Sequence, residues 1–272
     1  MTRLLAWLGF RPSIPGIEPL PRDLRMVARQ LLNGEPPSGW HALSSSAQAR
    51  VARGHWRGED VVLKVFLPRD PLELLKSLFR GSRGVRAVRR GHELEADGFH
   101  APVVLAHGWD GTREILLMRA VAGDSLSRLI SSRLGPPLLP VTDRQAVQRE
   151  FAAEVARLHH LRWLHGDLRL GNVLLSPPRP GGNFVFLDNE SSRKVDNDAR
   201  LRKNLVQLNM MRPRFLSRSS RLRFLLKYAQ TSEMSRSEVS ELAKYLMQAT
   251  EVRRAERNQR GGPKARFTAG AS

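Results

Sequence analysis

The chain has 272 residues, 41% of them hydrophobic, and it contains no cysteine. This apolar share suffices for a packed core and excludes a disordered chain, and the absence of cysteine excludes disulfides and thiolate metal sites. The 45 lysines and arginines exceed the 26 acidic residues, and the resulting formal net charge of +19 favours an anionic partner. No apolar run is long enough to span a bilayer, and we expect a cytoplasmic protein.

The first part of the chain has the pattern of a small antiparallel sheet. Residues 1–39 are predicted to form an N-terminal extension with one short helix near 22–33. Two strands then meet at Arg57-Gly58, and a second pair of strands meets at Asp110-Gly111, because Asp-Gly favours a two-residue hairpin turn. Between the two hairpins, residues 71–97 have a helical pattern.

The second part is predicted to be helical. Asp124 is expected to cap a helix after Gly123, and Thr142 with Gln145 fits a capping box that opens a longer helix. One face of that longer helix carries the apolar residues Val147, Phe151, Val155 and Leu158.

The last clear helix is predicted to begin at Ser235, which forms a capping box with Glu238. We expect it to bury Val239, Leu242, Leu246 and Met247. The expected class is therefore α+β with two lobes: an antiparallel-sheet N-lobe over 40–120 and a helical C-lobe over 121–257. A flexible basic tail over 258–272 completes the predicted organisation.

Two stretches of the chain are basic and contain no acidic residue. One lies between Glu73 and Glu93, and the other between Asp198 and Glu233. Such stretches predict an electropositive surface.

The segment LHGDLRLGNVLL, residues 164–175, places polar side chains between two apolar flanks. Asp167 and Asn172 are separated by four residues, so that one loop can turn both side chains toward the same point. The aspartate can accept a proton from a hydroxyl group, and the amide oxygen can bind a hard cation.

Two further residues complete a candidate site. Asp188 ends the apolar strand 184–187, and the intervening hairpin is expected to return it beside Asn172, where both can share one Mg²⁺. Lys64 interrupts the apolar strand 61–66 and needs an anion, which a nucleotide phosphate would supply.

In this order, the three elements resemble the protein-kinase-like phosphotransferases. The resemblance implies that Lys64 holds the α- and β-phosphates of ATP and that Asp167 is the catalytic base. It also implies that Asn172 and Asp188 bind Mg²⁺. Arg169 occupies the position where protein kinases usually have a lysine that neutralises the transferred phosphoryl group.

The chain also departs from protein kinases. Gly166 replaces the arginine before the catalytic aspartate, Asp188-Asn189-Glu190 lacks the glycine of D-F-G, and no A-P-E follows. We therefore expect a permanently assembled site that acts on a small or glycolipid substrate.

The phosphate-covering loop and the partner of Lys64 differ from the usual pattern as well. Serines replace the expected glycines, so that Ser45 and Ser46 are the candidate phosphate contacts. Glu93 is the preferred ion-pair partner of Lys64, although Glu95 lies on the same predicted helix. The alternative is that this helix supplies no such ion pair, because Arg89 and Arg90 occupy its earlier positions.

Further segments resemble the lipopolysaccharide core kinases, which phosphorylate Kdo or heptose. They are SRGVRAVRRGHELEADGFHAP, DARLRKNLVQLN and SSRLRFLLKYAQ. This resemblance, over about residues 40–230, implies ATP- and Mg²⁺-dependent transfer to a sugar hydroxyl of the lipid A-core. It also implies that the protein is peripheral at the cytoplasmic face of the inner membrane.

The partner expected from this family is an anionic glycolipid at an anionic membrane. Apolar residues 72–79 beside Lys76, Arg80 and Arg83 fit either a basic interfacial helix or a helix packed on the N-lobe. We expect a monomer and no nucleic-acid partner, because aromatic residues make up only 6% and none are spaced as a stacking platform. A kinase of another small molecule, of the aminoglycoside type, and an atypical protein kinase remain as alternatives.

Overall fold

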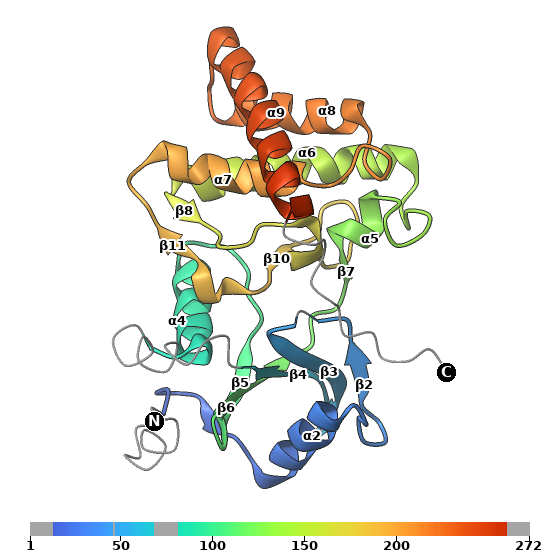
Figure 1. Cartoon of the computed structure of the whole chain (residues 1–272), viewed down its shortest axis with the longest axis vertical. Coiled ribbons are helices and arrows are strands. Elements are labelled where there is room, and N and C mark those ends of the chain that lie inside the picture. Colours follow the sequence, from blue (N-terminus) through green and yellow to red (C-terminus); the bar gives the residue numbers. More distant parts are fainter. Residues whose placement is uncertain (1–12, 46, 68–80, 260–272) are drawn as a thin grey trace. The chain divides into compact units, whose positions relative to one another are not determined.

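The computed structural model describes residues 13–45, 47–67 and 81–259 and divides them into two compact units. The first contains residues 13–91 and 102–120, and the second contains 92–101 and 121–259. Figure 1 shows the strands of the first unit and the helices of the second. The described residues include no helix that is both long enough and apolar enough to cross a membrane.

The first unit is built on a six-stranded sheet with the order β1-β5-β6-β4-β3-β2. The strands are β1 (Glu18–Pro19), β2 (His41–Leu43), β3 (Ala49–Trp56), β4 (Glu59–Phe66), β5 (Val104–Asp110) and β6 (Arg113–Arg119). All neighbours are antiparallel except β1, which runs parallel to β5.

Both predicted hairpins form, but one turn is displaced. Arg57 and Gly58 join β3 to β4 with positive φ angles of 51° and 80°. In the second hairpin Asp110 pairs with Arg113, so the turn is Gly111-Thr112, one residue later than predicted. Asp110 stays in its strand, where its carboxylate accepts two hydrogen bonds from Arg29 at 2.8 and 2.7 Å.

The sheet of the first unit is covered on both faces. Helix α2 (Arg22–Asn33) packs its buried side chains onto one face, against Val61, Leu63 and Val65 of β4. On the opposite face, Phe66 packs with Val88 of α4 (Arg83–Ala96). Residues of the predicted N-terminal extension therefore contribute a strand and a helix to this unit.

Helix α4 is described from Arg83 onward, and the earlier part of the predicted helix lies outside the described residues. Arg83 does not face solvent: it is 7% exposed and donates to the Gln48 carbonyl at 3.0 Å. Its guanidinium also stacks 4.6 Å from the Phe66 ring. Of the two alternatives for this segment, the contacts of Arg83 fit a helix packed on the N-lobe and not an interfacial surface.

Besides the end of α4, the described part of the second unit contains five helices and several short strands. The helices are α5 (Leu126–Ile130), α6 (Val141–His160), α7 (Asp198–Asn209), α8 (Arg218–Thr231) and α9 (Arg236–Gln259). Helix α8 packs along α6, and α9 packs against α7 and α8 (Figure 1). Two small sheets accompany them, formed by β7 (Asp124–Ser125), β9 (Val173–Leu175) and β10 (Phe184–Phe186), and by β8 (Trp163–Leu164) and β11 (Arg193–Lys194).

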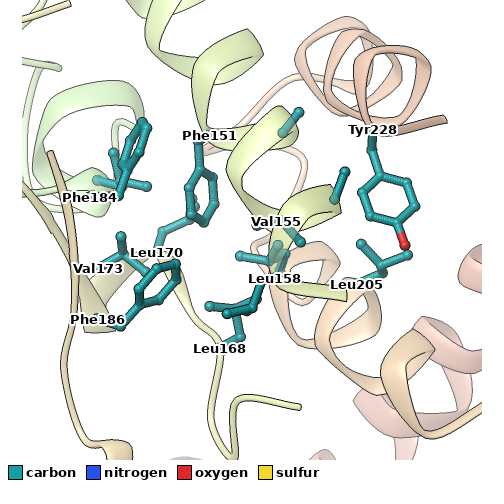
Figure 2. Packing of buried hydrophobic residues seen from close by; sticks show 14 of the residues in the cluster. Phe151, Val155, Leu158, Leu168, Leu170, Val173, Phe184, Phe186, Leu205 and Tyr228 are labelled. Carbon is teal, nitrogen blue, oxygen red and sulfur yellow. The ribbon is translucent and has the colours of Figure 1, made fainter. Parts of the chain in front are cut away.

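The apolar face predicted for α6 forms the centre of the core of this unit. Figure 2 shows Phe151, Val155 and Leu158 pointing toward the segment that carries Leu168 and Leu170. This contact fixes the backbone on both sides of Arg169, because both leucines are buried.

Two of the three predicted helix caps are wrong. Helix α6 begins at Val141 after Pro140, with no side-chain cap, because the N-cap residue is a proline, whose side chain has no oxygen to accept a hydrogen bond. Helix α5 is capped by Ser125, whose Oγ accepts from Arg128 N at 3.3 Å, while Asp124 pairs with Arg179.

The third cap is confirmed at the start of α9. Glu238 N donates to Ser235 Oγ at 3.3 Å, and Ser235 N donates to the Glu238 carboxylate at 2.7 Å. Leu242 and Leu246 are buried as predicted, but Met247 is 64% exposed. The next inward position is Thr250, four residues after Leu246.

Candidate active site

The loop between β8 and β9 brings Asp167 and Asn172 together. Asn172 Nδ2 donates to the Asp167 backbone carbonyl at 2.9 Å and to its carboxylate at 3.1 Å. A short 3-10 turn, η1 (Leu170–Asn172), carries Asn172 back toward the aspartate. Because the amide nitrogen is used in this way, the amide oxygen is the atom left to bind a cation.

Arg169 forms an ion pair with Asp167 through its guanidinium. Both side chains are partly open to solvent, at 47% and 40% exposure. The loop thus presents a carboxylate and a cation side by side at the surface of the second unit.

Asp188 lies at the same end of the β9–β10 hairpin as Asn172. The backbone N–H of Leu187 donates to the Asn172 carbonyl at 2.9 Å, which joins the two segments directly. Asp188 has a left-handed backbone (φ 59°, ψ 43°) at the start of the 3-10 turn η2 (Asn189–Ser191), and its side chain is exposed. Residues other than glycine rarely adopt this conformation, and they are often found at functional sites.

The donor set fits Mg²⁺ bound together with a nucleotide. The described residues hold no cluster of three or more His, Asp or Glu side chains that could bind a metal. Magnesium in phosphotransferases is usually held by one or two protein side chains together with phosphate oxygens and water. One carboxylate and one amide oxygen at the end of a hairpin match that requirement.

Buried His165 connects the loop to the segment before Asp188, a role that sequence reasoning missed. Its Nδ1 accepts from Asp167 N at 3.2 Å, and its Nε2 lies 2.9 Å from the Leu187 carbonyl. Burial lowers the pKa of His165, so the ring stays neutral. A neutral ring with its proton on Nε2 satisfies both contacts.

Two amides of α7 hold the loop backbone from the other side. The side chain of Asn204 accepts from His165 N at 3.0 Å and donates to His165 O at 2.5 Å. Gln207 accepts from Leu168 N and donates to Gly166 O, both at 3.0 Å. Sequence reasoning missed this pair too. The available signal was two amides, three residues apart, within the otherwise apolar run Leu205, Val206 and Leu208.

Gly166 is glycine because Ser191 lies against it. A Cβ atom at Gly166 would stand 2.2 Å from Ser191 Cβ and 3.0 Å from Ser191 C. The glycine at this position, which departs from the protein-kinase pattern, is therefore explained by the close approach of Ser191 within the second unit.

The remaining predicted residues lie on other elements. Lys64 projects from β4, with its Nζ 4.9 Å from the Phe66 ring centre, and Ser45 donates its hydroxyl proton to the Ala49 carbonyl at 3.0 Å. Glu93 is half-buried on α4, within the second unit. Ser46 lies outside the described residues.

Solved structures share this fold. The chain resembles the structure of WaaP in complex with acyl carrier protein, with a TM-score of 0.54 and 19% identity, over 86% of this chain and 97% of that one. It also resembles an aminoglycoside-3'-phosphotransferase of type VIII, with a TM-score of 0.56 and 17% identity, over 85% and 100% of the two chains. The predicted α+β, protein-kinase-like fold is therefore confirmed.

Sequence relatives and a family model complete the comparison. A probable bifunctional tRNA threonylcarbamoyladenosine biosynthesis protein from Methanothermobacter thermautotrophicus is 25% identical over 54% of this chain, which spans only 24% of that relative's length. The model of the lipopolysaccharide kinase (Kdo/WaaP) family matches residues 66–245, more than half of the chain. This match includes Asp167, Asn172 and Asp188 and begins just after Lys64. The chain therefore belongs to the Kdo/WaaP family of lipopolysaccharide kinases.

Proposed function

We propose that the protein transfers the γ-phosphoryl group of ATP to a sugar hydroxyl, on Kdo or heptose, of the lipopolysaccharide inner core. The observation that carries this proposal is the direct hydrogen bonding of Asn172 to Asp167, with Asp188 held at the same hairpin end by the Leu187–Asn172 backbone bond. Family membership supports the kinase class and the lipopolysaccharide acceptor.

In the proposed reaction, each site residue of the second unit has its own role. The acceptor hydroxyl gives its proton to the Asp167 carboxylate while its oxygen bonds to the γ-phosphorus and the bond to the β-phosphate oxygen breaks. Arg169, which pairs with Asp167 in this structure, would turn to the transferred phosphoryl group and neutralise its charge. Asn172 and Asp188 would hold Mg²⁺, which neutralises charge on the phosphates.

The first unit would supply the nucleotide contacts. Lys64 would bind the α- and β-phosphates, and the backbone at Ser45 and Ser46 would contribute N–H donors. In this proposal, Glu93 is the residue that orients Lys64.

The excess of basic residues favours a polyanionic acceptor. The lipid A-core carries several anionic groups, and a chain of net charge +19 attracts such a molecule at long range. Aminoglycosides are cations, so the same charge disfavours them. We further propose that the protein acts as a peripheral protein at the cytoplasmic face of the inner membrane.

Mass spectrometry of purified lipid A-core treated with the protein, ATP and Mg²⁺ tests the function. We expect the gain of one phosphate group, and Asp167→Ala should lower turnover by about 10²–10⁴ with nearly unchanged nucleotide affinity. Asp196→Ala, which alters another exposed aspartate, is the matched control. Near-normal turnover in Asp167→Ala, or phosphorylation of an aminoglycoside in place of the core, would contradict the proposal.

Asp188→Ala tests the metal role separately. This change should remove the Mg²⁺-dependent part of ATP affinity, because it deletes a charged ligand. Calorimetric titration of ATP with and without Mg²⁺ measures it. Equal ATP affinity under both conditions in the unchanged protein would exclude this role.

A further inference from the structure

Helix α8 has an outer side that combines leucines with arginines. Leu222 and Leu226, four residues apart, are 54% and 51% exposed. Arg218 and Arg223 are exposed beside them. Residues three or four positions apart lie next to one another on a helix, so Arg218, Leu222 and Leu226 form one stripe, with Arg223 beside Leu226.

The inner side of α8 accounts for the core contacts of this helix. Leu225, Tyr228 and Ala229 are buried, and the Phe224 ring lies 5.8 Å from that of Phe151 on α6. Leu222 and Leu226 therefore have no part in the core of the second unit.

A neighbouring loop extends the stripe. Ser132 N donates to Phe215 O at 3.0 Å, which ties the segment before α6 to the segment before α8. The segment before α6 carries the exposed leucines Leu134 and Leu138, α6 itself begins with the exposed Val141, and the segment before α8 carries the exposed arginines Arg212 and Arg214. We call these five residues, together with Arg218, Leu222, Arg223 and Leu226, the α8 surface.

The charged residues of the α8 surface are all basic, and few acidic residues lie near them in the sequence. No acidic residue occurs between Asp198 and Glu233, and Asp143 is the only one between Asp124 and Glu150. The surface therefore complements a partner that is anionic and offers an apolar layer just beneath its charges.

We propose that the α8 surface docks the protein on a bilayer containing anionic phospholipid. Leu222 and Leu226 enter the acyl boundary, while Arg218 and Arg223 bind lipid phosphates, for which the guanidinium fork is suited. A bilayer needs only exposed apolar side chains flanked by cations, and the convex side of a helix provides this without a groove. An acidic protein partner would require shape complementarity as well.

This inference extends the proposed function, because a lipid-borne acceptor must reach Asp167 from a membrane surface. Helix α5, which leads into the loop of the α8 surface, packs against η1, the turn that carries Asn172. Both features thus belong to one compact unit. The α8 surface belongs to the second unit, whereas Arg83, whose side chain is buried, belongs to the first.

Co-sedimentation of the full chain with vesicles tests the docking, without ATP or acceptor. Vesicles of phosphatidylcholine with phosphatidylglycerol should bind the protein, and pure phosphatidylcholine should bind it far less. Arg218→Ala with Arg223→Ala should weaken binding by about 30-fold, since each arginine near an anionic surface contributes about fivefold. Leu222→Ser with Leu226→Ser should weaken it on the order of tenfold, by loss of apolar burial.

Matched controls lie on α9. Arg236→Ala with Lys244→Ala removes the same charge, and Met247→Ser with Val252→Ser removes exposed apolar side chains of similar size. Both double variants should bind vesicles like the unchanged protein. Circular dichroism confirms that each variant is folded.

Three results would overturn the docking proposal: no binding of the unchanged chain to anionic vesicles, equal losses in the α8 and α9 variants, or binding of an acidic protein through these residues without vesicle binding. The kinase assignment is measured independently, on detergent-solubilised acceptor, where the α8 variants should keep normal turnover. Failure of one proposal therefore leaves the other intact.

Discussion

Gln207 holds the peptide groups on both sides of Asp167. Its amide oxygen accepts from Leu168 N, and its amide nitrogen donates to Gly166 O, both at 3.0 Å. Asn204, one turn earlier on α7, holds His165 in the same two-directional way and also donates to the Gln207 amide oxygen at 2.9 Å. The orientation of the proposed base is therefore set by a helix that contributes no reacting group.

Gln207→Leu should lower kcat by roughly 10²-fold and leave the KM for ATP nearly unchanged, because a misplaced reacting group costs rate more than binding. Steady-state kinetics well below the melting temperature measures this. The control is Gln248→Leu on the exposed part of α9. A proportional fall in kcat and in the folded fraction would indicate a purely structural role.

Gly166→Ala should disrupt the same loop for a steric reason. The added Cβ would lie 2.2 Å from Ser191 Cβ, a distance that real Cβ atoms do not reach. We expect a large loss of turnover, and Ser191→Gly should restore part of it by removing that atom. Full recovery is not expected, because Ser191 C and Cα would still lie 3.0 and 3.1 Å away. No rescue at all would show that the glycine serves another purpose.

The buried carboxylate of Glu114 links three polar groups within the first unit. Buried on β6, it accepts hydrogen bonds from Ser82 Oγ and from Gly84 N at 2.8 Å, and its carboxylate lies 2.9 Å from His107 Nε2. Glu114→Ala should lower the free energy of unfolding by about 2–4 kcal/mol, because three buried partners lose their acceptor. Urea denaturation measures the loss, and Glu59→Ala, which breaks an exposed pair with Arg119, should cost far less.

Buried His159 makes the stability of the second unit depend on pH. Burial lowers the pKa of His159 from 6.5 to about 4, while its ring contacts Tyr228 OH at 2.9 Å. Below pH 6.5 the unfolded chain binds a proton that the folded chain does not, so stability falls as the pH drops toward 4. Between pH 7 and pH 5 this amounts to about 2 kcal/mol.

Thermal unfolding at several pH values tests that slope. His159→Gln should flatten the curve between pH 6.5 and 5. His165, whose pKa burial also lowers, should leave a residual slope. A curve unchanged by the substitution would assign the pH dependence to other groups.

The sequence alone determined the local features of this protein. The Arg57-Gly58 turn and the Ser235–Glu238 cap follow from contacts within a few residues, and the inward face of α6 follows from the helical spacing of its apolar residues. The closeness of Asp167 and Asn172 is also a local feature, because a loop with four residues between them has few conformations and can bring the two side chains together. Recognition of the family rested on these short-range patterns too.

Only the tertiary structure decided which residues far away in the sequence hold these local features in place. The turn at Gly111-Thr112 was displaced by one residue where Arg29 holds Asp110 in the strand, 81 positions away along the chain. Arg83 was buried because Phe66 and the Gln48 carbonyl lie where its side chain projects. The Asn204 and Gln207 amides bond a loop 39 to 41 positions earlier, and no local propensity predicts such a pairing. Hydrogen bonds and burial across long separations depend on how whole elements pack, and that packing is a property of the folded chain.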